Sequence, residues 1–230
     1  MPTDTSASQT TQLYERLRAA ILGLDAAPGE RLSERGLEQT FGASRTPARA
    51  ALMRLESEGL VRREGRGWMV TPIDLTEIHS LAEMRSAVEA AAARYAVARA
   101  SDDDIAALGE LLDADRPAAL EEQTEEQGVR AGSSFHSELV QLSGNRFMVE
   151  SVQGALTRLE RTRWLEVRTP EARALAWNDH RAILDAIAAR DADRAALLVA
   201  DHIHGTNERL IAALTADQRR FRGHGLAIVG

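Results

Sequence analysis

Helical periodicity is the feature that most constrains this chain, because it runs through nearly the whole sequence and lapses in one short region. From Asp74 to about residue 216, apolar side chains recur at helical spacing and no stretch alternates as a strand would. The β-prone runs are Leu60–Arg63 and Trp68–Val70, on either side of Glu64-Gly65-Arg66-Gly67. We therefore expect a mainly α protein that carries one small β-hairpin.

Composition excludes several classes of protein. With 230 residues and 44% hydrophobic residues, the chain is long enough for one large or two small domains. It has no cysteine, which excludes disulfides, zinc ribbons and thiol nucleophiles and favours a reducing compartment, so we expect a cytoplasmic protein. Arg, Asp or Glu interrupts every apolar stretch, so we expect neither a secretion signal nor contact with a membrane.

Charge is distributed unevenly along the sequence. Residues 1–72 hold 10 Arg against 9 acids, whereas residues 73–230 hold 18 Arg against 26 acids, a net charge of −8. The net charge of −7 for the whole chain argues against a nonspecific nucleic-acid coat. A local basic module on an acidic body remains compatible with these numbers.

The first 72 residues predict a winged helix-turn-helix. Helices are expected at Gln9–Leu24, Ser33–Phe41 and Ser44–Glu58, and Gly42-Ala43 forms a tight turn between the last two. Two short helices joined by so tight a turn are typical of a helix-turn-helix, and the hairpin that follows would be its wing. We assign residues 9–72 to this domain and expect residues 1–8 to be a flexible N-terminus.

Arginines occupy the positions of this module that would face DNA. Arg45 and Arg49 lie one turn apart at the start of the helix that would enter a major groove, and their forked side chains match guanine O6 and N7. Other candidates for contacts with phosphates, bases or the minor groove are Arg35, Ser44, Thr46, Arg66 and Gly67. The alternative for any one of these arginines is a solvated surface charge.

The rest of the chain predicts an all-α antiparallel bundle. Its helices are expected near 74–100, 102–113, 117–143, 145–167, 170–189 and 191–216. The short connections between them favour antiparallel neighbours, and we assign residues 73–217 to this domain. We expect residues 218–230 to form a loose C-terminal tail.

Three histidines lie on apolar stripes of three different expected helices. His136, His180 and His202 should each point inward, whereas His204 is rotated by about 200° from His202 and should face elsewhere. Imidazoles that converge in a bundle suit Zn, Ni or a similar divalent metal ion. The alternative is that each one is an ordinary buried histidine with its own hydrogen-bond partner.

Arg85 and Glu89 also lie on an apolar stripe. They form either an intrahelical ion pair or, if Arg85 is buried, part of a site in which an anionic ligand pairs with its guanidinium. A small carboxylate that binds near Arg85, His136, His180 and His202 is therefore the expected ligand.

The N-terminal module resembles the winged-helix signature of the GntR family of transcription regulators. The resemblance rests on Pro28–Arg35, Phe41–Leu52 and Leu55–Val61. It implies that operator DNA is contacted by the positions that match the family's, namely Arg35, Arg45, Thr46, Arg49 and Gly67.

The helical part, from about Leu75 to Ala216, resembles the FCD effector domain of the FadR subfamily. The matching pieces are Arg85–Glu89, Phe135-His136, Ser143–Asn145, His180–Ile187 and His202-Ile203. In the metal-binding members, three histidines join an Asp or Asn one turn before the first of them. That position is Gly132 here, so the resemblance implies a weaker metal site, with a fourth position left to water or to an effector carboxylate.

These features together predict a homodimeric transcription repressor, not an enzyme, whose helical domain binds a metabolite and changes its affinity for an inverted-repeat operator. A metal-dependent hydrolase that uses the three histidines is the alternative, but the sequence has no HExxH motif and a hydrolase leaves the winged helix unexplained. A helical interaction module without an effector is the third hypothesis, and the inward histidines speak against it.

Overall fold

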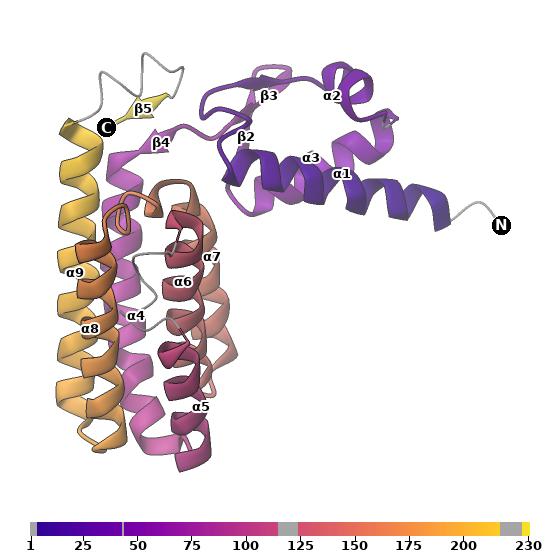
Figure 1. Cartoon of the computed structure of the whole chain (residues 1–230). Helices are drawn as coiled ribbons and strands as arrows, with labels where there is room; N and C mark the ends of the chain where they lie inside the picture. Colours follow the sequence, from indigo (N-terminus) through magenta and orange to yellow (C-terminus); the bar gives the residue numbers. More distant parts are fainter. Residues whose placement is uncertain (1–3, 43, 115–123, 217–226) are drawn as a thin grey trace. The chain divides into compact units, whose positions relative to one another are not determined.

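The computed structural model describes residues 4–42, 44–114, 124–216 and 227–230, and it divides the chain into two compact units (Figure 1). The first unit comprises residues 1–75 together with 216–230, and the second comprises residues 76–215. The first unit is therefore built from both ends of the chain.

The first unit is the expected winged helix-turn-helix. Its elements are α1 (Asp4–Leu22), β1 (Arg31–Leu32), α2 (Glu34–Phe41), α3 (Arg45–Ser57), β2 (Val61–Glu64) and β3 (Gly67–Val70). The strands form an antiparallel sheet in the order β1-β3-β2, with Val61 opposite Val70 and Glu64 opposite Gly67. The wing is thus larger than the expected hairpin, because β1 adds a third strand to it.

Local signals explain the tight connection between α2 and α3. The Ser33 hydroxyl accepts a hydrogen bond from the Gly36 amide and caps the start of α2. Gly42 ends that helix in the left-handed region, at φ 67°, where its amide donates to the Glu38 carbonyl at 3.0 Å. The chain then enters α3 at Ser44, whose side chain makes no capping hydrogen bond.

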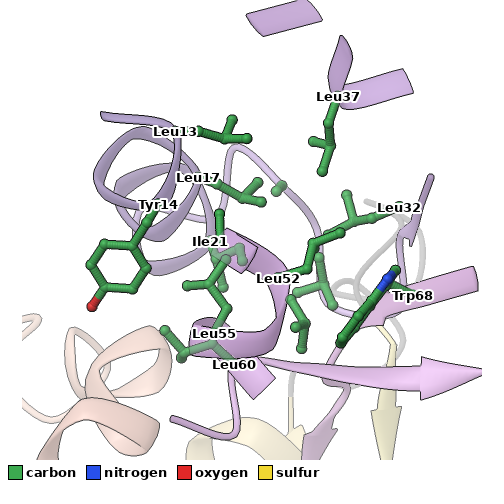
Figure 2. Packing of buried hydrophobic residues seen from close by; sticks show 14 of the residues in the cluster. Leu13, Tyr14, Leu17, Ile21, Leu32, Leu37, Leu52, Leu55, Leu60 and Trp68 are labelled. Carbon is green, nitrogen blue, oxygen red and sulfur yellow. The ribbon is translucent and has the colours of Figure 1, made fainter. Parts of the chain in front are cut away.

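The core of this unit lies between α1, α3 and the sheet (Figure 2). Leu17 and Ile21 of α1 meet Leu52 and Leu55 of α3, and Trp68 of β3 covers the sheet side. Burying each large apolar side chain contributes roughly 1.5–3 kcal/mol to the free energy of unfolding. The core therefore fixes which side of α3 remains exposed.

Two expectations about the ends of the chain are wrong within the described residues. Helix α1 begins at Asp4 rather than Gln9, so residues 4–8 are helical instead of flexible. An acidic residue is favourable at a helix N-terminus, and residues 4–8 precede the apolar stripe that marked the helix in the sequence. Residues 1–3 lie outside the described part of the chain.

The expected loose tail also ends in a strand. β5 (Ile228–Val229) pairs in parallel with β4 (Ile73–Asp74), and the Ile228 side chain is only 2% exposed. The Ala227 amide donates to the Pro28 carbonyl at 3.0 Å, and the Ile73 amide donates to the Ala227 carbonyl at 2.9 Å. Burial of Ile228 and these backbone hydrogen bonds hold the C-terminus in place, while residues 218–226 lie outside the described residues.

The second unit is the expected helical bundle, in which the helices run lengthwise beside one another (Figure 1). Its helices are α4 (Leu75–Arg99), α5 (Asp102–Asp113), α6 (Glu125–Gln141), α7 (Arg146–Arg163), α8 (Pro170–Ala188) and α9 (Ala192–Ala216). Fully buried alanines such as Ala92, Ala93 and Ala96 on α4 let neighbouring helices approach closely. No helix in the described ranges is long and apolar enough to span a membrane.

Two helix boundaries differ from those expected. Helix α6 was expected from residue 117 but begins at Glu125, because Thr124 and Gln127 form a capping box there. Residues 117–123 lie outside the described part of the chain. Helix α7 ends at Arg163 rather than at residue 167, and the chain turns before Pro170 starts α8.

Candidate functional site

The exposed face of α3 carries the arginines expected to read DNA. Ala48 and Leu52 on the opposite face are completely buried in the core, which leaves Arg45 and Arg49 exposed to solvent. Ser44 and Thr46 are exposed at the start of the same helix, and the hydroxyl of Ser44 is not used as a cap. The start of α3 therefore presents two guanidinium groups and two hydroxyls to solvent.

The remaining DNA candidates lie on other elements of the same unit. Arg35 is exposed on α2, and Arg66 is exposed in the turn between β2 and β3, next to the half-buried Gly67. Gly65 precedes Arg66 at φ 58°, a conformation that glycine adopts without strain. Whether these residues contact DNA stays a prediction.

Arginines elsewhere in the first unit already have partners. The Arg54 guanidinium lies 3.6 Å from the Tyr14 ring centroid, the Arg63 guanidinium lies 3.7 Å from that of Trp68, and Arg18 pairs with Glu58 at 2.9 Å. In the described part of the chain, no ion pair or ring contact involves the four arginine candidates Arg35, Arg45, Arg49 and Arg66. These four guanidinium groups are therefore available to an external partner.

The second unit brings the three expected histidines together. His136 on α6, His180 on α8 and His202 on α9 are 1%, 5% and 7% exposed. The Nε2 atom of His202 lies 3.3 Å from that of His136 and 3.2 Å from that of His180. His204 is exposed, as its rotation from His202 predicted.

Two carboxylates and an aromatic ring orient these imidazoles. Glu89 Oε2 lies 2.6 Å from His136 Nδ1, and Asp179 Oδ2 lies 2.9 Å from His202 Nδ1. A carboxylate accepts a hydrogen bond, so both Nδ1 atoms carry the proton and both Nε2 atoms present a lone pair. The His180 ring stacks on Phe135 with 4.2 Å between ring centroids.

Electrostatics favours the neutral imidazole at two of these histidines, His136 and His180. Burial, reinforced by Arg85, lowers the pKa of His136 to about 3 despite the opposing carboxylate of Glu89. Burial and the neighbouring histidines lower the pKa of His180 well below 6.5. Burial alone would raise the pKa of Glu89, but Arg85 and His136 outweigh it and lower the pKa to about 2.

The geometry of the cluster fits a divalent metal ion. One ligand atom from each histidine lies within 4.8 Å of the others. At Zn–N distances of roughly 2.0–2.1 Å, neighbouring ligand nitrogens should be about 3.0–3.4 Å apart, which agrees with the two short contacts at His202. The hydrogen bonds at Nδ1 leave the Nε2 atoms of His136 and His202 as acceptors, which are the atoms that a cation between the three rings would bind.

Gly132 lies on α6 one turn before His136, where the metal-binding FCD members carry a fourth ligand. A Cβ atom at Gly132 would lie 3.0 Å from Arg163 Nη2 and 3.9 Å from His180 Cε1. Arg163 is 5% exposed, and its Nη1 and Nε atoms bond Ser133 Oγ at 2.7 Å and Glu166 Oε2 at 3.2 Å. A guanidinium therefore borders the space that a fourth ligand would enter.

A pocket opens beside the histidines. Its lining combines His180 and His202 with three arginines, one glutamate and several apolar side chains. The charged lining residues are Arg163, Glu166, Arg173 and Arg209. Apolar lining residues include Leu111, Leu112, Phe135, Val167 and Trp177. Such a mixture suits a small anion with an apolar body.

Arg85 does not line this pocket. Its Nε donates to Glu89 Oε1 at 2.7 Å, so the ion pair considered from the sequence is present, but it is fully buried. Glu89 in turn accepts from His136, which makes Arg85 part of the support for that imidazole. The buried Arg85 Nη2 has no hydrogen-bond partner among the described residues.

Both parts of the chain match known protein families. Residues 9–70 match the gntR family of bacterial regulatory proteins, and residues 80–205 match the FCD domain. The chain belongs to the GntR family of transcription regulators. Its FCD domain is the helical unit, and this GntR regulator is not an enzyme, because the matched families and relatives are transcription regulators. Nothing supports the hydrolase alternative.

Similar proteins match this chain over most of its length. The Nta operon transcriptional regulator of Aminobacter aminovorans is 33% identical over 183 residues, which is 76% of this chain and 82% of that protein. The HTH-type transcriptional repressor RspR of Escherichia coli (strain K12) is 26% identical over 198 residues, or 86% of each chain. Among solved structures, E. coli McbR/YncC is similar with a TM-score of 0.73 and 22% sequence identity. The match covers 89% of this chain and 98% of that chain. The last similarity shows a common fold.

Two groups at the FCD site of this GntR regulator were not identified from the sequence. Asp179 directly precedes His180 but supports His202 on the next helix, and this contact depends on how α8 and α9 are rotated. Arg163 is one of 28 basic residues and carries no spacing signal. The glycine at position 132, where a ligand side chain was expected, was the sequence signal that another group borders this position.

Proposed function

We propose that this chain is a cytoplasmic, homodimeric transcription repressor that binds a short inverted-repeat operator and releases it when a small carboxylate binds the FCD domain. The contrast between the arginines of the first unit carries the DNA part of the proposal. Arg54 and Arg63 are stacked on aromatic rings, whereas Arg45 and Arg49 project from α3 with no partner in the described residues. Guanidinium groups on the exposed start of a recognition helix suit guanine in the major groove.

The other candidates divide the remaining contacts between DNA backbone and minor groove. Arg35 on α2 would position the domain on phosphates, and Ser44 and Thr46 offer hydroxyls to phosphates or bases. Arg66 and Gly67 at the tip of the wing would enter the minor groove. A twofold dimer presents two such surfaces, so the operator would be an inverted repeat.

The effector proposal rests on the pocket beside the histidines. Three arginines face one glutamate there, within a region of the chain, residues 73–230, that carries 18 Arg against 26 acids. The general field of that region repels anions, so this local excess of cations would attract them. His180 and His202 also line the pocket, and Arg85 supports the histidine cluster through Glu89 and His136.

A divalent ion such as Zn or Ni would be held by His136, His180 and His202. When bound, it would supply a Lewis-acidic centre for a ligand oxygen. The protein contributes neutral imidazoles oriented by Glu89 and Asp179. Because Gly132 offers no side-chain donor, a mild chelator should remove the ion. Zinc titration followed by elemental analysis will measure the metal bound by the parent protein and by the variant His180→Asn, before and after the chelator is added.

Two experiments test the proposed function. Selection of bound duplexes from a random library should yield an inverted repeat, and recovery of a single unpaired half-site would contradict the dimer. Native mass spectrometry of freshly purified protein should report the dimer mass, the bound metal and a copurified carboxylate together. A monomer that selects no DNA sequence would overturn the proposal.

A further inference from the structure

Gly132 leaves a space beside the histidine centre, and among the described residues the charged atom within 4 Å of a Cβ position there is Arg163 Nη2. The position where a side chain would start is 3.0 Å from Arg163 Nη2 and 3.9 Å from His180 Cε1. By these two distances, Nη2 lies no more than about 7 Å from the imidazole of His180. A single small anionic group placed there would reach both.

Two hydrogen bonds hold the Arg163 guanidinium in a fixed orientation and involve its Nε and Nη1 atoms, but not Nη2. Ser133 accepts from Nη1 and Glu166 accepts from Nε, and the guanidinium is 5% exposed. In the described parts of the chain, no acceptor is recorded for Nη2, the atom that faces Gly132. A preorganised donor of this kind binds a carboxylate with little loss of side-chain entropy.

Arg85 and Arg163 differ in how their charges are compensated and in whether they line the pocket. Its guanidinium is equally buried, but Glu89 compensates its charge at 2.7 Å and it does not line the pocket. Arg163 lines the pocket, and the carboxylate of Glu166 lies 3.2 Å from its Nε atom. Of these two buried arginines, Arg163 is therefore the one that an incoming anion can reach.

We propose that Gly132 and Arg163 form a subsite for the acidic group of the ligand, so that the ligand, rather than the protein, supplies the carboxylate beside the three histidines. This inference rests on the proposed effector function and names the residues that select the ligand's charge. The ligand class is a carboxylate on a small apolar body, because Phe135, Val167 and Trp177 line the same pocket. A neutral amide of the same shape is rejected, since it leaves the guanidinium charge unpaired.

The test compares acetate with acetamide, two probes of nearly equal size that differ in charge. Thermal unfolding is followed in the full-length protein with a chelator present, and sodium chloride keeps the ionic strength equal. Arg163→Gln removes the charge, while Arg194→Gln removes an exposed arginine of the same domain that does not line the pocket and serves as the control. Gly132→Asp places a carboxylate in the subsite, and Gly132→Ala adds the Cβ atom alone.

Acetate should raise the melting temperature of the parent protein, and acetamide should not. Arg163→Gln should weaken acetate binding by about 10- to 100-fold, whereas Arg194→Gln should change it by less than about threefold. Gly132→Asp should have a higher melting temperature than Gly132→Ala in chloride and should no longer respond to acetate.

Three results would overturn the inference: no stabilisation of the parent protein by acetate, equal stabilisation by acetamide, or an unchanged response in Arg163→Gln. None of these results concerns operator selection, so the DNA-binding part of the proposed function is tested independently. A copurified carboxylate that still binds Arg163→Gln would preserve the effector function and remove Arg163 from its site.

Discussion

The two units of this regulator use arginine in opposite ways. On α3, Arg45 and Arg49 are exposed and lack partners among the described residues, so their charges remain solvated until another molecule arrives. In the helical bundle, Arg85 is buried and its charge is compensated by Glu89 at 2.7 Å. Removal of Arg45 or Arg49 should therefore affect binding and leave folding intact, whereas removal of Arg85 should affect folding first.

The largest effect is expected from breaking the buried pair. Arg85→Met leaves the carboxylate of Glu89 buried without its cation, which should lower the free energy of unfolding by about 3–5 kcal/mol. Denaturant unfolding monitored by circular dichroism will measure it. The double variant Arg85→Met/Glu89→Gln removes the unpaired charge but keeps an acceptor for His136, so it should recover much of the loss. A double variant no more stable than Arg85→Met would show that the buried charge is not the cause.

A smaller effect, on binding alone, is expected at the exposed face of α3. Arg45→Ala and Arg49→Ala should each weaken binding to the selected operator by about 1–3 kcal/mol and relax its base preference. Arg35→Ala should weaken all sequences more evenly, as loss of a phosphate contact does. Fluorescence anisotropy at fixed salt measures these affinities, and melting temperatures near the parent value will confirm that the variants fold.

Acid should destabilise the bundle through its histidines. The pKa values of His136 and His180 are lowered in the folded protein, so the unfolded chain binds more protons as the pH falls below 6.5. Each histidine should therefore cost about 1 kcal/mol of stability between pH 6.5 and 5.5. The lowered pKa of Glu89 adds a further loss only below about pH 4.5. Urea unfolding with a chelator present will measure how steeply the free energy of unfolding falls with pH. This dependence should be unchanged in His204→Asn, which replaces an exposed histidine, and weaker in His180→Phe.

The smallest effect separates two serines that begin neighbouring helices. Ser33 caps α2 through the Gly36 amide, so Ser33→Ala should lower the free energy of unfolding by about 1 kcal/mol. Ser44 makes no capping hydrogen bond, so Ser44→Ala should leave stability within about 0.5 kcal/mol of the parent. If the two variants are equally destabilised, the hydroxyl of Ser44 is not available to DNA in the way proposed.

Residues on long, regular patterns were predictable from the sequence. The apolar stripes correctly placed His136, His180 and His202 on inward faces, and the Ser-Arg-Thr turn placed Arg45 at the start of a helix. The capping box of Thr124 and Gln127 has a sequence signature, a threonine followed three residues later by glutamine, but the predicted helix start at residue 117 did not use it.

Contacts between helices were not predictable, because periodicity fixes the face of a helix but not its register against a neighbour. Asp179 contacts His202 rather than its neighbour in sequence, and Arg163 at the end of α7 reaches Gly132 on α6. β5 is two residues long, too short for any alternation to predict a strand. Its pairing with β4 depends on contacts that are remote in sequence.

The pairing of β4 with β5 makes the helical domain an insertion rather than an appendage. The polypeptide leaves the winged-helix unit through Ile73 and returns to it at Ile228, so both ends of the bundle are joined to the same small ribbon. A fragment cut after residue 75 would lack Ile228 and lose the hydrogen bond between Ala227 and Pro28. Dissection of this protein into an isolated DNA-binding fragment therefore calls for a short linker that replaces the bundle and keeps the last four residues.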